Sequence, residues 1–121
     1  MERTLYGIKN CDTVRRARND LAQHGVTYRF HDLRAEGIDR DTLNHWVSAL
    51  GLDRVLNRRG TTWRQLSTEI ADPSDEASLI ALMQEHPSLI KRPVFQRGQQ
   101  VQIGYPRPEA DQRIAWFAAN D

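Results

Sequence analysis

The sequence predicts a mixed α/β fold, and three observations carry this prediction. An apolar, β-favouring run at Thr4–Ile8 is followed by a helical pattern and by a second alternating run at Thr27–Leu33, which is typical of a βαβ unit. The middle of the chain is helical, and the last third returns to strands and a closing helix. With 121 residues the chain is long enough for one compact core and short for two, so we expect a single domain over residues 1–121.

The first helical pattern follows the chain's only cysteine, Cys11. Val14, Ala17 and Leu21 recur at positions i, i+3 and i+7, which gives one buried helix face, and Gly25 ends the helix. A strand, helix and strand in such close succession form a right-handed crossover between parallel strands. We therefore expect Cys11 at the corner where the first strand meets the first helix.

The middle of the chain carries several helix start and stop signals. Asp39 is a good N-cap and Gly51 ends that helix, a turn of helix at 53–56 follows, and a short helix runs through Leu66. A later helix is expected to begin with Pro73 as its first helical residue and to end before Pro87. The side chains expected to be buried by these helices are Leu43, Trp46, Val47, Leu50, Trp63, Leu79, Ile80, Leu82 and Met83.

The last third predicts a hairpin and a helix. Val94 and Phe95 are separated from a second β-favouring run at 101–103 by a turn around Gly98. Pro93 should lie at an edge, at a bend or in a cis peptide bond, because proline cannot donate to a β-ladder. The closing helix is expected to bury Ala110, Ile114, Trp116, Phe117 and Ala118.

Composition excludes several classes of function. The formal net charge is +1, so bulk electrostatics favour neither nucleic acid nor an anionic membrane as a partner. No apolar run approaches the length of a membrane span, no signal peptide opens the chain, and one cysteine forms no internal disulfide, so we expect a cytoplasmic protein. We expect a monomer because no exposed apolar stripe demands a partner. The four histidines lack metal-ligand spacing, so no metal site is expected: they are His24, His31, His45 and His86.

Cys11 is the candidate nucleophile. Unpaired backbone amides and the positive dipole end of a helix N-terminus lower the pKa of a thiol and hold an oxyanion, and Arg15 and Arg16 add positive charge. The alternative is that a lone cysteine is a small buried apolar residue. Without a second cysteine, any adduct on Cys11 must be resolved by an external thiol, for which glutathione is the candidate. Its carboxylates have four candidate partners: Lys9, Arg59, Lys91 and Arg92.

Three motifs carry a resemblance to a known family. They are Lys9–Arg16, Asn57–Trp63 and Lys91–Pro93, in this order along the chain. Together they resemble the arsenate reductase (ArsC) family, and within it the YffB branch that is related to the Spx regulators. The resemblance implies a thioredoxin-like fold with a helical insertion, at about residues 38–86, between an N-terminal βαβ unit and a C-terminal ββα unit. In such folds an extended peptide hydrogen-bonds beside the residue that corresponds to Pro93.

The resemblance also implies a mechanism. In arsenate reductases of this type the thiolate that matches Cys11 attacks arsenate, arginines hold the oxyanion, and glutathione and glutaredoxin complete the turnover. Arg92 matches one of these arginines. A second of these arginines corresponds to Arg59, which fits the Asn-x-Arg-Gly pattern, or to Arg58, the residue directly before it. The first motif adds Lys9, Asn10 and Arg15 to the expected binding set, and Arg107 is only a displaced candidate for a third arginine.

Two hypotheses remain open. The first is an enzyme, a glutathione-dependent thiol oxidoreductase with Cys11 as nucleophile. The second is an Spx-like protein that binds RNA polymerase without catalysis and without direct contact to nucleic acid. Spx regulators commonly carry Cys-x-x-Cys, and Val14 occupies the second position here, so an intramolecular disulfide switch at this place is excluded.

Overall fold

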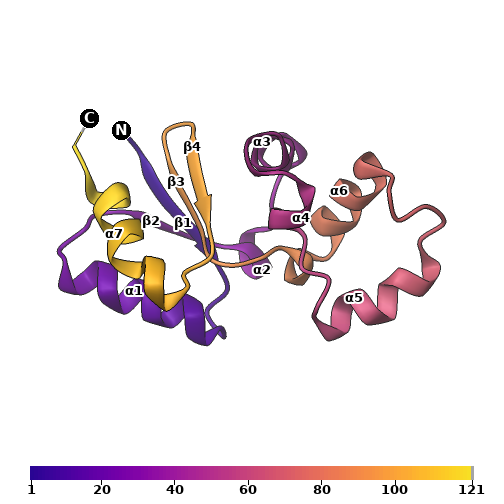
Figure 1. Ribbon diagram of the computed structural model, residues 1–121, viewed down its shortest axis with the longest axis horizontal. Coiled ribbons are helices and arrows are strands. Elements are labelled where there is room, and N and C mark those ends of the chain that lie inside the picture. The colour runs from indigo at the N-terminus through magenta and orange to yellow at the C-terminus, as the bar shows by residue number, and fades with distance from the viewer. Residues whose placement is uncertain (121) are drawn as a thin grey trace. The chain divides into compact units, whose positions relative to one another are not determined.

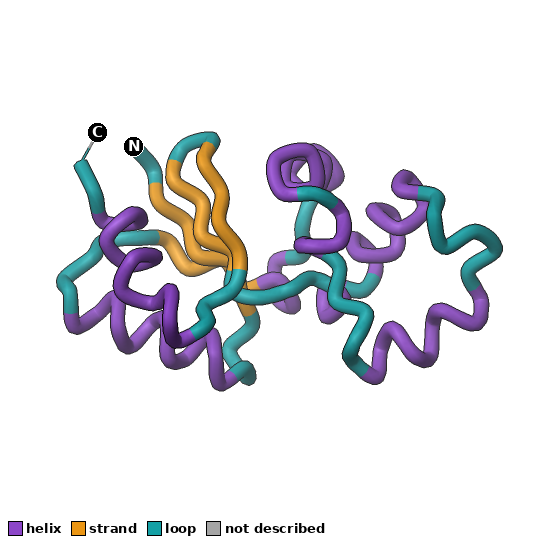
Figure 2. The backbone as a smooth tube through the Cα atoms, in the orientation of Figure 1, coloured by secondary structure: helices purple, strands orange, loops and turns teal. Residues whose placement is uncertain are grey.

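The computed structural model describes residues 1–120, and these residues form two compact units. The first unit contains residues 1–36 and the chain from Arg92 onward, and the second contains Gly37–Lys91. Figure 1 shows the course of the chain, and Figure 2 shows that the strands belong to one unit while the other is built from helices and loops. We describe each unit by itself, and the single domain expected from the sequence stays a prediction.

The first unit is built on a four-stranded sheet with the strand order β2-β1-β3-β4. Strand β1 (Arg3–Gly7) is parallel to β2 (Arg29–Asp32) and antiparallel to β3 (Val94–Arg97), which forms a hairpin with β4 (Gln100–Ile103). Both the parallel βαβ unit and the C-terminal hairpin predicted from the sequence are confirmed.

Two helices cover the same face of this sheet. They are α1 (Asp12–Gln23) and α7 (Ala110–Ala118), which follows the 3₁₀ turn η3 (Arg107–Glu109). Leu5 and Phe95, paired across β1 and β3, are both fully buried beneath them, and each contributes about 1.5–3 kcal/mol by leaving water. The core cluster consists of Leu5, Ala17, Leu21, Phe95, Tyr105, Ile114 and Phe117. Trp116 is only half-buried, and its indole donates to Gln100 at 3.2 Å, which corrects its expected place in the core.

Gly7 sets the distance between β1 and α1. A Cβ atom at this position would lie 2.9 Å from both methyl groups of Val14, closer than real carbon contacts. The missing side chain therefore lets the first turn of α1 pack directly on the end of β1. Cys11 immediately precedes this turn, so its place depends on the same contact.

The second predicted strand, expected at Thr27–Leu33, is shorter at both ends: β2 begins at Arg29, and Leu33 belongs to the four-residue helix α2 (Leu33–Glu36). Asp32 accepts hydrogen bonds from the amides of Arg34 and Ala35, at 3.0 and 3.3 Å, and the Glu36 carboxylate accepts from the Asp32 amide at 3.0 Å. This reciprocal cap ends the strand. The hydrogen bond from Asp32 is also the main reason why the pKa of Glu36 is lowered.

The second unit is helical. Its elements are α3 (Arg40–Leu50), α4 (Leu52–Val55), α5 (Thr61–Leu66), η1 (Ser67–Glu69), α6 (Glu76–Glu85) and η2 (Pro87–Leu89). The expected N-cap of α3 is confirmed, since the Asp39 carboxylate accepts from the Thr42 amide at 2.7 Å. Trp46 is fully buried as expected, whereas Trp63 is half-buried. No helix within residues 1–120 has the length and apolar character that a membrane span requires.

The start of α6 differs from the prediction. The helix begins at Glu76, with Asp75 as its N-cap, and Pro73 lies in a turn before it. The cause is Asp72, whose carboxylate accepts from both the amide and the hydroxyl of Ser74, at 2.9 and 2.6 Å. Such an Asx turn competes with helix formation. Leu82 is half-buried rather than buried, a second correction to the expected face of this helix.

Candidate functional site

Cys11 is the N-cap residue of α1. Its backbone is extended, with φ −139° and ψ 121°, and its carbonyl accepts the first helical hydrogen bond from the Arg15 amide at 2.9 Å. The thiol does not cap the helix, and the residue is half-exposed, so it is not sealed in the apolar core. The first amides of a helix have no partner within the helix and point past the N-cap residue. The corner therefore has the geometry that favours an anion.

The sheet topology brings a second motif to the same edge as Cys11. Because β1 and β3 are antiparallel, the chain that leaves β1 toward Cys11 lies at the edge where Arg92 and Pro93 lead into β3. The Arg92–Pro93 peptide bond is cis, one of the three arrangements expected for this proline. The Gly104 amide, just after β4, donates to the Pro93 carbonyl at 2.8 Å. Three loops therefore meet at this edge of the first unit.

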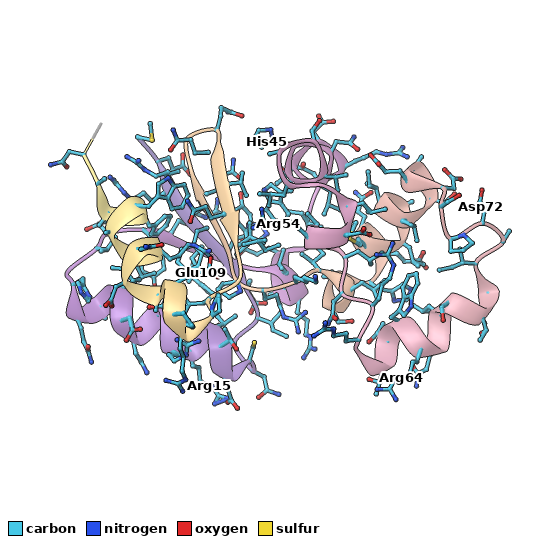
Figure 3. All side chains as sticks on the ribbon, in the orientation of Figure 1. Arg15, His45, Arg54, Arg64, Asp72 and Glu109 are labelled. Atoms are coloured by element: carbon cyan, nitrogen blue, oxygen red, sulfur yellow. The ribbon has the colours of Figure 1, made fainter. Side chains whose placement is uncertain are left out.

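The cationic side chains near Cys11 differ in burial and in their contacts with the rest of the protein. Lys9 and Asn10 are exposed, and within residues 1–120 the Lys9 ammonium makes no hydrogen bond or ion pair. Arg15 projects from α1 (Figure 3) and pairs with Asp12 at 2.8 Å, with 56% of its side chain exposed. Its charge is partly compensated by that carboxylate. Arg92 is half-buried, and its Nε atom is fully enclosed.

The guanidinium of Arg16 is bound to another residue of the first unit. Its guanidinium donates to the Tyr105 carbonyl and stacks on the Tyr105 ring, 4.5 Å from the centroid. The Tyr105 hydroxyl in turn donates to Asp20 at 2.5 Å. Burial, followed by this hydrogen bond, raises the pKa of Tyr105. Tyr105 thus fixes α1, and with it the Cys11 corner, to the loop that follows β4.

Sequence reasoning missed Tyr105 and Arg113 as parts of this edge. Arg113, on α7, is buried and donates to the carbonyls of Ile103 and Gly104, the first at 3.1 Å. One sequence feature could have identified Arg113: it is an arginine on the apolar face of the closing helix, directly before Ile114. Arg107, the displaced candidate for a third binding arginine, is exposed at the start of η3, and its role stays a prediction.

The two adjacent arginines lie in the second unit, in the turn between α4 and α5. Backbone hydrogen bonds join this region to the segment that ends at Lys91: the Asn57 amide donates to the Leu89 carbonyl at 2.7 Å, and the Lys91 amide donates to the Val55 carbonyl at 2.8 Å. The second motif and Lys91, the first residue of the third motif, are therefore neighbours within the second unit. That Arg58 or Arg59 acts together with Cys11 stays a prediction.

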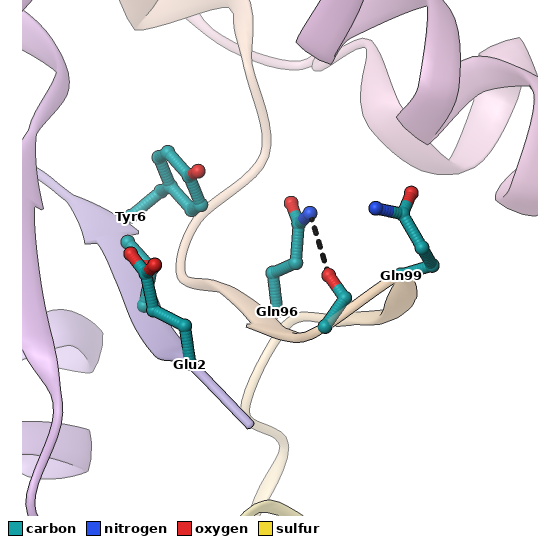
Figure 4. Close-up of a pocket in the computed structure, with 6 residues that line it drawn as sticks. Glu2, Tyr6, Gln96 and Gln99 are labelled. Atoms are coloured by element: carbon teal, nitrogen blue, oxygen red, sulfur yellow. Dashed lines mark hydrogen bonds between the residues drawn. The ribbon is translucent and has the colours of Figure 1, made fainter.

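A pocket of about 260 Å³ lies at the sheet of the first unit. Figure 4 shows four of its residues as labelled sticks and the 3.0 Å hydrogen bond from Gln96 to the Gly98 carbonyl. Cys11 does not line it, so this pocket is separate from the candidate site. Its lining residues are Glu2, Thr4, Tyr6, Gln96, Gly98 and Gln99.

Comparison with known proteins identifies the fold and the family. The model of the ArsC family matches residues 6–112. A solved structure of a protein named YffB is 44% identical, with a TM-score of 0.86, and the match covers 97% of this chain and 99% of that one. Arsenate reductase from Vibrio cholerae is 25% identical, with a TM-score of 0.78 and coverage of 94% and 98%. The global transcriptional regulator Spx of Listeria innocua is 27% identical over 108 residues, 88% of this chain and 82% of the regulator.

These matches extend over almost the whole chain. They confirm the thioredoxin-like fold expected from the order of the elements and from the position of Cys11. The relationship to YffB and to the Spx regulators that the three motifs indicated is confirmed as well. The chain belongs to the ArsC family.

Proposed function

We propose that the protein is a glutathione-dependent thiol oxidoreductase of arsenate-reductase type, with Cys11 as its nucleophile. One observation carries the proposal: Cys11 is half-exposed at the N-terminus of α1, at the sheet edge where Arg92 and Pro93 also lie. The similarity to the arsenate reductase of Vibrio cholerae supports the same class of reaction. We place the reaction in the cytoplasm, where glutathione keeps thiols reduced.

The first step is a nucleophilic attack by the Cys11 thiolate. With a glutathione mixed disulfide, the thiolate attacks the glutathione sulfur, the partner thiolate leaves, and a Cys11–glutathione disulfide forms. A second glutathione thiolate then attacks the glutathione sulfur of this adduct, which returns Cys11 to the thiolate and releases oxidised glutathione. With arsenate, the thiolate bonds to arsenic, and one arsenate hydroxyl leaves as water after taking a proton from solvent. Glutathione and glutaredoxin then supply the two electrons that reduce arsenic from the +5 to the +3 state, and water hydrolyses the arsenic–sulfur bond, which releases arsenite and frees Cys11.

The neighbouring cations have the task of binding anionic groups. Lys9 follows the end of β1, and its ammonium group has no hydrogen-bond or ion-pair partner among residues 1–120, while Arg92 brings a planar guanidinium that suits carboxylates and oxyanions. Asn10 and the first amides of α1 supply further donors. An extended glutathione backbone is expected to run beside Pro93, at the start of β3. Arg59, or its neighbour Arg58, would supply another guanidinium from the second unit.

Glutathione disulfide and arsenate provide the test. We expect mass spectrometry to find glutathione on Cys11 of the native chain and on no residue of Cys11→Ser. The rate of iodoacetamide alkylation at Cys11 should fall when glutathione or arsenate occupies the corner. A native chain that forms no mixed disulfide, and whose alkylation neither compound slows, would contradict the proposal.

The similarity to the Spx regulator of Listeria innocua favours a second function, a regulatory protein that binds RNA polymerase without catalysis. Regulation would then need surface contacts rather than a thiolate, since Val14 stands where a Cys-x-x-Cys switch needs its second cysteine. A pull-down with RNA polymerase subunits separates the two functions. Retention of polymerase by both the native chain and Cys11→Ser would favour regulation, whereas a mixed disulfide without retention favours the enzyme.

A further inference from the structure

The polar pocket of the first unit lies on the sheet face opposite the one that α1 and α7 cover. Leu5 belongs to the core cluster beneath those helices, so its strand neighbours Thr4 and Tyr6 face the other way. Gln96 is paired with Thr4 across β1 and β3, which places its side chain on the same face. All residues that line the pocket belong to β1, to β3 and to the chain next to them in the first unit.

The most buried residue of this pocket is Thr4. It is 6% exposed, and within residues 1–120 its hydroxyl makes no hydrogen bond. Buried polar groups are almost always hydrogen-bonded, because an unpaired group has lost its bonds to water without a replacement. Since Thr4 lines the pocket, the partner of its hydroxyl has to come from the pocket itself.

The charge at the pocket is negative. Of the six lining residues, Glu2 alone carries a formal charge. Glu2 is exposed at the rim, and among the described residues its carboxylate has no hydrogen bond or ion pair. Arg29 is paired with Thr4 from the other side, on the same face, but its guanidinium is bound to Glu36 at 2.9 Å. The pocket therefore favours a cation.

The neutral side chains of the pocket suit the same kind of ligand. Figure 4 shows Glu2 and Tyr6 on one side and Gln96 and Gln99 on the other. The Tyr6 ring is held by the His31 ring, with 4.8 Å between their centroids. An aromatic ring attracts an organic cation, and carboxamide and hydroxyl oxygens accept hydrogen bonds from an ammonium group.

We infer that this pocket binds a small organic cation that carries a primary ammonium group. The Glu2 carboxylate pairs with the ammonium, the Thr4 hydroxyl bonds to a polar group of the ligand, and the Tyr6 ring packs on its alkyl chain. The volume of about 260 Å³ lies just below the roughly 300–1,000 Å³ of pockets for drug-sized ligands, so the ligand is as small as a diamine. The inference does not depend on the proposed function, because Cys11 does not line the pocket.

A titration of the full ¹⁵N-labelled chain tests the pocket, with putrescine as the cation and butanediol as the uncharged molecule of the same chain length. The side-chain amide signals of Gln96 and Gln99 should move with saturation when putrescine is added. Those of Gln102 should stay in place, because Gln102 is paired with Phe95 and lies on the other face of the sheet. An equal response to butanediol, or no saturable shift at either lining glutamine, overturns the inference.

The charge of Glu2 is tested by Glu2→Gln, which keeps the shape of the side chain. Putrescine binding should weaken about fivefold, as expected for the loss of a partly exposed charge-assisted contact. Asp111→Asn, which removes an exposed carboxylate of α7 and changes the net charge equally, is the matched control and should leave the affinity unchanged. An unchanged affinity in Glu2→Gln, or an equal loss in the control, overturns the inference.

Thr4→Val removes the hydroxyl and keeps the branched side chain. Because no described residue bonds to this hydroxyl, the urea midpoint of unfolding should not fall, whereas the affinity for putrescine should fall about threefold. A destabilised variant, or one with unchanged affinity, overturns the inference. Cys11→Ser should bind putrescine as tightly as the native chain does, and a loss of binding in that variant would place the ligand at the thiol and overturn the inference as well.

Discussion

The two regions that carry the expected site residues are built in different ways. At the sheet edge of the first unit, Cys11 is placed by regular elements: Val14 packs against Gly7, and Tyr105 is buried in the core cluster and bonded to α1. In the second unit, the turn from Asn57 to Gly60 is held by hydrogen bonds, by an ion pair and by one half-buried ring. The first region depends on close packing, and the second depends on polar contacts at the surface.

This difference matches what each region is proposed to do. A nucleophile must be held within a few tenths of an ångström of its reacting geometry, which rigid packed elements provide. An arginine that binds an anion tolerates more movement, because its long side chain adjusts to the position of the ligand. We therefore expect substitutions at the sheet edge to affect stability more than those in the turn.

The largest effect on reactivity is expected from Cys11→Ser. All thiol chemistry, including mixed-disulfide formation, should stop, while the free energy of unfolding should change by less than about 1 kcal/mol, because a serine is also a good N-cap. Thermal melting and mass spectrometry of the glutathione-treated chain measure the two properties. A large loss of stability would show that the sulfur is a packing residue, contrary to its proposed role as a nucleophile.

The largest effect on stability is expected from Gly7→Ala. Its new methyl group would meet Val14 at 2.9 Å, so we expect a loss of about 2 kcal/mol from the overpacked contact between β1 and α1. Urea unfolding gives the value. The double variant Gly7→Ala, Val14→Ala removes the clashing methyl groups and should recover stability relative to Val14→Ala alone. Equal losses in both backgrounds would exclude the contact as the cause.

The fold could be predicted where burial periodicity decides the structure. The alternation of the strands and the spacing of Val14, Ala17 and Leu21 reflect one buried face each, so the order of the elements followed from them. The predicted ends of the elements were wrong where a side chain forms a hydrogen bond with the backbone. The carboxylates of Asp32 and Asp72 accept hydrogen bonds from nearby amides, which ends β2 before Leu33 and delays the start of α6, and propensity alone does not show which aspartate will do so.

The candidate site could be predicted only in part, for a similar reason. Cys11 and Arg92 are tied to strand ends, so the topology that places the strands also places them. The buried role of Tyr105 depends on Asp20, 85 positions away in the sequence, and no local pattern reports such a partner. Asp53 pairs with Arg58 and not with Arg59, and the sequence alone does not show which of the two adjacent arginines it would select.

Tyr105→Phe tests the same sheet edge and is expected to have a smaller effect on stability than Gly7→Ala. Loss of the hydrogen bond to Asp20 should cost about 1 kcal/mol, while the ring stays beneath Arg16. The pKa of Tyr105 is raised in the folded protein, so the phenol contributes its full stabilisation below its unfolded pKa of 10.0. This contribution to stability is lost as the pH rises above that value. Urea unfolding between pH 8 and 11 should therefore show a flatter alkaline decline for the variant, and identical curves would contradict the assignment.

The smallest effect on stability is expected from Asp53→Asn in the turn of the second unit. The ion pair with Arg58 is partly exposed, with 37% of the arginine side chain and 86% of the aspartate side chain accessible, so its loss should cost about 0.5 kcal/mol. Released from Asp53, however, Arg58 becomes free to compete for anions, so its Nε–Hε signal should begin to respond to sulfate in this variant alone. A loss of stability as large as that of Gly7→Ala would mean that the turn, too, depends on packing, and the contrast between the two regions would not hold.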